Sequence, residues 1–199
     1  MMKQLVIAAL AIGATATPAF AQEDSTFEGP WVGATAGYDS IGADDSTDSG
    51  SEDGVAYGFA AGYDMKLAGM IVGIEAELGE SSVSARGADI LEAGDELRLS
   101  AGRDIYAGVR VGLPISNRMM AYAKGGYTDL RYEAAYTLDD EVTESSATSG
   151  GYRLGAGMEF KLGKPFARIE YRYSDYGSFS DSDLETDRHQ VMVTAGLRF

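Results

Sequence analysis

The chain has 199 residues, no cysteine, a single histidine and a formal net charge of −15 at pH 7. Without cysteine it can form neither disulfides nor thiolate metal sites, so backbone pairing and packing must hold the fold together. So acidic a chain would be repelled by nucleic-acid phosphates, and no nucleic acid is expected as a partner. The same pattern of short alternating segments runs from about residue 31 to the end, which favours a single domain.

The first 21 residues differ in kind from the rest. Lys3 supplies a positive start, residues 5–16 are mostly apolar, and Ala19-Phe20-Ala21 has the small-x-small pattern of a cleavage site. The alternative, an N-terminal membrane anchor, needs about 20 apolar residues, and this run is shorter and interrupted. We therefore expect a signal peptide over residues 1–21 and a mature domain over residues 22–199.

The mature chain alternates apolar and polar residues with a period of two, which is typical of strands. The pattern is clearest at 54–64, where Tyr57 and Phe59 share one face and Gly58 and Ala60 share the other. It predicts eight strands, at about 31–38, 54–64, 69–79, 96–113, 119–132, 149–162, 166–176 and 188–199.

The connections between these strands alternate in length. Long ones are expected at about 39–53, 80–95, 133–148 and 177–187, and short ones at 64–68, 114–118 and 163–165. Four long and three short links fit an antiparallel up-and-down barrel with both termini on the short-turn side, the asymmetry of outer-membrane barrels. The fold class expected is therefore all-β, an eight-stranded transmembrane β-barrel.

Alternation alone does not say which face is inside, because a soluble lipocalin-like barrel also alternates with its apolar face inward. Glycine separates the two cases. It recurs on the polar face of six strands, at Gly33, Gly37, Gly58, Gly62, Gly73, Gly102, Gly108, Gly112, Gly151, Gly155, Gly157 and Gly196. Glycine weakens a strand, so its concentration on one face indicates crowding, as in the narrow lumen of an eight-stranded barrel.

The glycine-bearing face also carries charges of both signs, which we interpret as an ion-pair network inside the lumen. Enclosed charges must be paired or hydrated, and such pairs serve to fix one arrangement more than to add stability. Arg103 is an exception on the apolar face, where it could extend toward lipid headgroups. The alternative is the solvated outer face of a soluble barrel. The expected network comprises Glu75, Glu77, Arg98, Asp104, Arg110, Lys124, Arg153, Glu159, Lys161, Arg168, Glu170, Arg172 and Arg198.

Aromatic residues on the apolar face fall into two groups, as in the interfacial girdles of membrane barrels. Ordinary strand propensity also enriches tyrosine, so this signal only supports the assignment. Tyr63, Phe160 and Phe199 lie toward the short turns, and Tyr38, Tyr57, Tyr127, Tyr152 and Tyr173 toward the long connections.

Four short motifs in this order resemble the small outer-membrane β-barrel family that includes the OmpA-type transmembrane domain and the opacity-like surface proteins. They are Gly29-Pro30-Trp31-Val32-Gly33, Tyr122-Ala123-Lys124-Gly125-Gly126-Tyr127, Arg168-Ile169-Glu170-Tyr171-Arg172-Tyr173 and Ala195-Gly196-Leu197-Arg198-Phe199. The resemblance implies outer-membrane lipid, lipopolysaccharide and the barrel-insertion machinery as partners of a monomer, with Phe199 as part of the insertion signal. The chain ends at the last strand, so no peptidoglycan-binding domain and no wall-anchoring role are expected.

Little in the sequence points to catalysis or to a cofactor. His189 has acidic neighbours but no His-x-Ser arrangement for a nucleophile, so a rim histidine is expected rather than an active site. Asp44, Ser46 and Asp48 have the spacing of a calcium loop, but Ser49 and Val55 stand where that loop needs glycine and glutamate. We expect a polar solvated loop there, with loose divalent-cation binding near lipopolysaccharide phosphates left as a hypothesis.

These features predict a non-enzymatic envelope protein of the outer membrane, with a structural or surface-interaction role. The long connections, with the flanking residues Glu96 and Asp175, hold 21 of the 31 acidic residues and would present an acidic surface outside the cell. One alternative is a narrow channel for ions or small solutes, since eight strands leave a lumen just filled by side chains. Another is a secreted soluble barrel that binds an apolar ligand. The external partner is not specified by the sequence.

Overall fold

The computed structural model describes residues 27–45, 48–88, 96–138, 141–176 and 185–199. These are almost entirely strand, and none of them form a helix long and apolar enough to cross a membrane. The expected signal peptide lies outside the described residues, so its cleavage stays a prediction. The strands are β1 (Gly29–Asp45), β2 (Asp48–Leu67), β3 (Met70–Ser81), β4 (Ser84–Ala88), β5 (Glu96–Ser116), β6 (Met119–Leu138), β7 (Glu141–Lys161), β8 (Pro165–Tyr176) and β9 (Glu185–Arg198).

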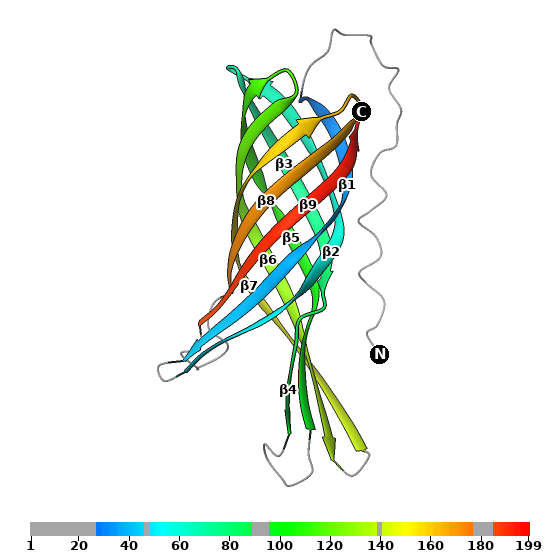
Figure 1. The fold of residues 1–199 in the computed structure, drawn as a ribbon, viewed down its shortest axis with the longest axis vertical. Helices are drawn as coiled ribbons and strands as arrows, with labels where there is room; N and C mark the ends of the chain where they lie inside the picture. Colours follow the sequence, from blue (N-terminus) through cyan, green and yellow to red (C-terminus); the bar gives the residue numbers. More distant parts are fainter. Residues whose placement is uncertain (1–26, 46–47, 89–95, 139–140, 177–184) are drawn as a thin grey trace, which may run out of the picture.

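The strands close into one antiparallel barrel (Figure 1). β1 pairs with β9, and β3 pairs with β5, so the described barrel wall has no open edge. β4 does not add a ninth strand to the barrel wall. β3 and β4 pair with successive parts of β5 and are separated only at Ser82 and Val83, so they occupy one strand position. The predicted eight-stranded up-and-down barrel is confirmed.

Three of the predicted long connections are wrong in extent, because the strand ladder continues far into them. The one predicted at 80–95 contains β4, which pairs with β5 as far as Ala88 opposite Glu96. β1 and β2 pair as far as Asp45 opposite Asp48, and β6 and β7 as far as Leu138 opposite Glu141. The physical reason is that both faces of a strand meet water beyond the lipid, so the apolar alternation stops while backbone pairing goes on. Residues 84–88, 96–100, 133–138 and 141–148 form a sheet that projects past the barrel (Figure 1), called here the β4–β7 extension.

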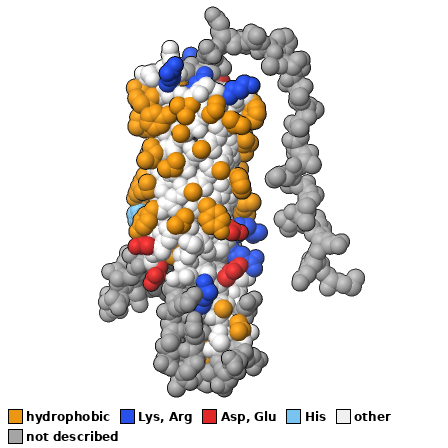
Figure 2. Space-filling model, turned by 45° about the vertical axis from the view of Figure 1, so that its right-hand side comes forward, with side chains coloured by type: hydrophobic (Ala, Val, Ile, Leu, Met, Phe, Trp, Pro, Cys, Tyr) orange, Lys and Arg blue, Asp and Glu red, His pale blue; other side chains and the backbone are white. Residues whose placement is uncertain are grey.

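The apolar face of the barrel wall points outward and the charged face inward. Phe59 and Ile74 are 71% and 64% exposed, whereas Glu75 and Arg153 are 5% and 1% exposed. Figure 2 shows hydrophobic side chains spread over the barrel wall, with acidic and basic side chains beyond their lower edge. The predicted sidedness of the barrel is therefore correct, and a soluble barrel with an apolar interior is excluded.

Lumen glycines make room for large aromatic side chains. A Cβ on Gly62 would lie 2.6 Å from the Trp31 ring, and a Cβ on Gly196 would lie 2.5 Å from the Phe166 ring. Trp31 and Phe166 meet edge to face, with ring centroids 5.8 Å apart. Glycine at these two positions therefore leaves room for the aromatic rings in the lumen, as expected from the sequence.

Apolar side chains close the end of the lumen where the short turns lie. Phe27, Ile71 and Met120 are buried together there. The Arg198 guanidinium donates a hydrogen bond of 2.9 Å to the Phe27 carbonyl oxygen, which fixes the segment that enters β1.

Candidate functional site

The most distinctive feature of the described lumen is an electrically balanced set of buried charges. Because seven acidic and seven basic groups cancel, the formal net charge of −15 is carried by the rest of the chain. The acidic members are Asp39, Asp64, Glu75, Glu77, Asp104, Glu159 and Glu170, and the basic members are Arg110, Lys124, Arg153, Arg168, Arg172, Arg188 and Arg198.

Near the short turns, two carboxylates hold three arginines. The Glu159 carboxylate accepts from Arg168 at 2.7 Å, from Arg198 at 2.8 Å and from Arg110 at 3.1 Å. Asp64 accepts from Arg110 at 2.5 Å and from Arg198 at 2.7 Å. This group of five, the short-turn cluster, carries one excess positive charge.

Aromatic rings offset part of that excess. The Arg168 guanidinium lies 3.8 Å from the centre of the Trp31 ring and 4.5 Å from that of Phe166. Arg110 lies 5.3 Å from the centre of the Tyr122 ring. A cation over an aromatic face is attracted by the ring quadrupole, more strongly when both are removed from water.

A second cluster fills the middle of the lumen around Glu77. Its carboxylate accepts from Lys124 at 2.7 Å and from Arg172 at 2.8 Å, and lies 3.5 Å from Arg153. Lys124 also reaches Glu75 and Glu170, each at 2.8 Å. β3, β6, β7 and β8 are thereby joined through the lumen as well as along the barrel wall.

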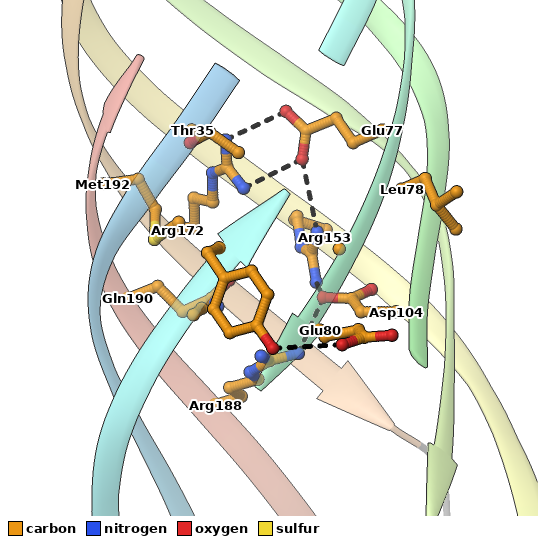
Figure 3. Close-up of a pocket in the computed structure, with 13 residues that line it drawn as sticks. Thr35, Glu77, Leu78, Glu80, Asp104, Arg153, Arg172, Arg188, Gln190 and Met192 are labelled. Atoms are coloured by element: carbon orange, nitrogen blue, oxygen red, sulfur yellow. Dashed lines mark hydrogen bonds and ion pairs between the residues drawn. The ribbon is translucent and has the colours of Figure 1, made fainter. Parts of the chain in front are cut away.

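This second cluster continues toward the long connections. Arg153 donates to Asp104 at 2.7 Å, and Arg188 donates to the same carboxylate at 2.7 Å. Arg188 also binds both oxygens of Asp39, each at 2.7 Å. The chain of pairs from Glu75 to Asp39 thus runs unbroken, as the part drawn in Figure 3 shows.

Little free volume remains among these side chains. A cavity of about 20 Å³ lies beside Arg172, Arg188 and Gln190 (Figure 3). That is room for about one water molecule. The side-chain oxygen of Gln190 has no hydrogen-bond partner among the described residues, and it lines this cavity.

Eleven of the thirteen residues expected in the lumen network lie buried in these two clusters. The exceptions are Lys161, half-buried at the last position of β7 and without an ion pair in the described part, and Arg98, which is exposed. Three members were not predicted, namely Asp39, Asp64 and Arg188, because they lie at or just beyond the ends of the predicted strands. Asp39, which we counted among the acidic residues of a connection, is fully buried.

A β-bulge explains the error at Arg98. Ala101 pairs with Tyr132 and Asp104 pairs with Leu130, so two residues of β5 stand opposite Arg131 alone. An extra residue shifts the alternation by one. Ala101 is therefore buried in place of Gly102, and Arg98 points to the outside.

His189 lies on the outer wall, outside the lumen network. Its Nδ1 is 2.7 Å from the Tyr171 hydroxyl and its Nε2 is 2.9 Å from Asp187. These contacts supply an acidic orienter but no serine or cysteine nucleophile. Phe199, the expected insertion signal, is 68% exposed at the end of β9, and its role stays a prediction.

The candidate calcium ligands Asp44, Ser46 and Asp48 lie outside the described side chains. Among the described residues no group of three or more acidic or histidine side chains is placed to hold a metal ion. At the barrel rim, hydrogen bonds from Tyr38 and Ser40 lower the pKa of the exposed Asp53 carboxyl.

Solved structures with the same architecture include the Neisserial surface protein A, at 17% identity with a TM-score of 0.54, covering 85% of this chain and 97% of that one. They also include the attachment invasion locus protein Ail of Yersinia pestis in complex with the heparin analogue sucrose octasulfate. Its identity is 15% and its TM-score 0.50, covering 87% of this chain and 100% of that one. At these identities the likeness shows the fold alone.

Sequence relatives extend the comparison. The chain is 30% identical over 202 residues to the 31 kDa outer-membrane immunogenic protein of Brucella melitensis biotype 1, covering 87% of this chain and 83% of the relative. It is 30% identical over 157 residues to the 22 kDa outer membrane protein of Rhizobium leguminosarum bv. viciae, covering 72% and 67%. The family pattern of the outer membrane protein beta-barrel domain matches residues 7–199. The chain therefore belongs to the outer membrane protein β-barrel domain family, and it is a protein of the bacterial outer membrane.

Proposed function

We propose that this protein is a non-enzymatic component of the cell surface, in which a plugged barrel anchors a strand-built extension outside the outer membrane. The observation that carries the proposal is the contrast between a lumen filled by paired charges and strands that continue past the membrane. Outer-membrane barrels place their long connections on the extracellular side. The extension would then be the part available for contacts with the envelope surface or with other molecules.

The competing function is a narrow channel, which the run of charged groups along the lumen could favour. Conduction would require several pairs around Glu77 and Asp104 to part together, because Arg153 links the two carboxylates. A planar bilayer separates the two functions. We expect no steady conductance from the refolded protein, and stable single-channel steps would favour the channel.

The role of the extension can be tested by shortening it at matched register pairs. One variant replaces residues 85–99 and 134–145 by Asn-Gly turns, which cuts the sheet at Ser84 opposite Ser100 and at Glu133 opposite Ser146. A control replaces residues 42–51 in the same way, which cuts the β1–β2 hairpin at Ile41 opposite Glu52.

Both variants are produced in a strain that lacks the protein, and detergent resistance of the cells is measured. Migration of the unheated protein on a gel verifies that each barrel is folded. We expect the control to restore resistance and the variant without the β4–β7 extension to fail. Full restoration by the latter would show that the barrel alone suffices and would contradict the proposal.

A further inference from the structure

The β4–β7 extension carries a group of arginines on one face, in a chain whose charge is otherwise strongly acidic. Tyr127 is exposed on the outer wall, and Arg131 and Glu133 follow on the same face of β6. The bulge in β5 turns Arg98 to this face as well, three pairs along the ladder from Ala101 at the edge of the bulge. A residue predicted to line the lumen is thus presented to the outside.

Arg98 is exposed and forms no ion pair with another described side chain. In the antiparallel register it lies opposite Arg86 of β4 on one side and opposite Ala135 of β6 on the other. An exposed guanidinium that no described carboxylate engages is available to an anion.

The same face is hollowed into a pocket of about 520 Å³, lined by Arg98, Ser100, Arg131, Glu133, Ala134, Ala135, Ser145 and Ser146. Arg131 donates through one terminal nitrogen to the Ser146 hydroxyl at 2.9 Å. Its Nε is buried and forms an ion pair with Glu133 at 3.6 Å, but it has no hydrogen-bond partner among the described residues, because that distance is beyond hydrogen-bonding range. A guanidinium edge is therefore held in place with a donor unused.

With Tyr127 at the membrane interface, as expected from the sequence, the pocket lies beyond the lipid. Arg131 is four residues past the girdle residue Tyr127 on β6, which corresponds to roughly 13 Å of strand. At that height the outer wall of the extension faces headgroup sugars and water rather than hydrocarbon.

We propose that this pocket binds a phosphorylated saccharide. Arginine presents a planar fork that matches phosphate oxygens, so Arg98 and Arg131 would take the phosphate. The hydroxyls of Ser100 and Ser146 and the carboxylate of Glu133 are suited to sugar hydroxyls. The inference rests on the proposed function, because it requires the extension to lie outside the cell.

The test uses the Arg131 Nε–H resonance of the folded protein in phosphatidylcholine nanodiscs, titrated with glucose 1-phosphate. We expect a saturable shift that unphosphorylated glucose does not produce. Arg98→Gln should weaken the affinity about tenfold or more, since a hydrogen bond to a charged group is lost. Arg118→Gln, on an exposed turn at the opposite end, is the matched control and should leave the affinity unchanged.

Nanodiscs that contain lipopolysaccharide identify the source of the saccharide. If the surrounding lipopolysaccharide fills the pocket, the resonance starts at its shifted position and glucose 1-phosphate has no further effect. If the natural ligand is a soluble saccharide, the titration is the same in both lipids. Absence of a shift in phosphatidylcholine, or equal affinities for the Arg98→Gln and Arg118→Gln variants, would overturn the inference. Neither result depends on the detergent resistance that tests the proposed function.

Discussion

The lumen and the β4–β7 extension use the same backbone ladder for opposite purposes. In the lumen, seven acidic and seven basic groups are buried, balanced and engaged with one another. In the extension, Arg98, Ser145 and Ser146 are exposed to solvent. A ladder of hydrogen bonds therefore sets the position of side chains, whereas burial decides whether those side chains hold the protein together or remain available for binding.

The sharpest way to break this comparison is to remove one lumen charge. Glu159→Gln leaves Arg110, Arg168 and Arg198 with Asp64 as their remaining carboxylate in the short-turn cluster. We expect a loss of about 3–5 kcal/mol in the free energy of unfolding, the usual effect of leaving buried charge uncompensated.

Urea unfolding followed by fluorescence measures this loss, because the single tryptophan, Trp31, lies against Arg168. The control is Glu80→Gln, which removes an exposed carboxylate that accepts a hydrogen bond from Tyr57. This control should change stability by less than about 0.5 kcal/mol. Equal effects of the two substitutions would mean that burial does not separate the two regions.

Adding a side chain at a lumen glycine should lower the free energy of unfolding by less than removing a lumen charge does. Gly62→Val would push a side chain into the Trp31 ring, and overpacking of this kind costs about 1–3 kcal/mol. Ala61→Val, on the exposed face of the same strand, is the control and should be nearly neutral. The urea midpoint of gel migration reports both. A neutral Gly62→Val would refute the explanation given for glycine on this face.

The ion pair at the long-connection end of the lumen tests whether the network acts as a unit. Asp39→Asn and Arg188→Gln, alone and together, form a double-mutant cycle for a bidentate ion pair. We expect a coupling free energy of about 0.5–3 kcal/mol from urea unfolding of the four proteins. If the effects of the two substitutions on the free energy of unfolding were simply additive, this ion pair would not be coupled within the lumen network.

Sequence reasoning succeeded where alternation was uniform and failed where it was interrupted. The burial of Glu75 and Arg153 could be predicted from the alternation of inward and outward side chains, because no bulge interrupts that alternation in β3 or β7. Asp39 has the parity of its buried neighbours, and extending the predicted first strand by one residue would have found it. Arg188 was already the first residue of the predicted last strand, and its parity with the buried Gln190 would have placed it in the lumen. Arg98 could not be placed, because a bulge depends on pairing between strands and leaves no period of its own.

The smallest effect is expected at the rim, with His189→Ala. The imidazole is hydrogen-bonded to Tyr171 and Asp187, so it has as many partners as some lumen groups. Its side chain is 45% exposed, however, and water can replace both partners when the ring is removed. We expect a change below about 0.5 kcal/mol in the free energy of unfolding, measured by urea titration in detergent.

A loss comparable to that of Glu159→Gln would mean that hydrogen bonding, rather than burial, distinguishes the groups that hold the barrel together. Lipid hydrolysis that disappeared with this substitution would instead reveal a catalytic role for the histidine.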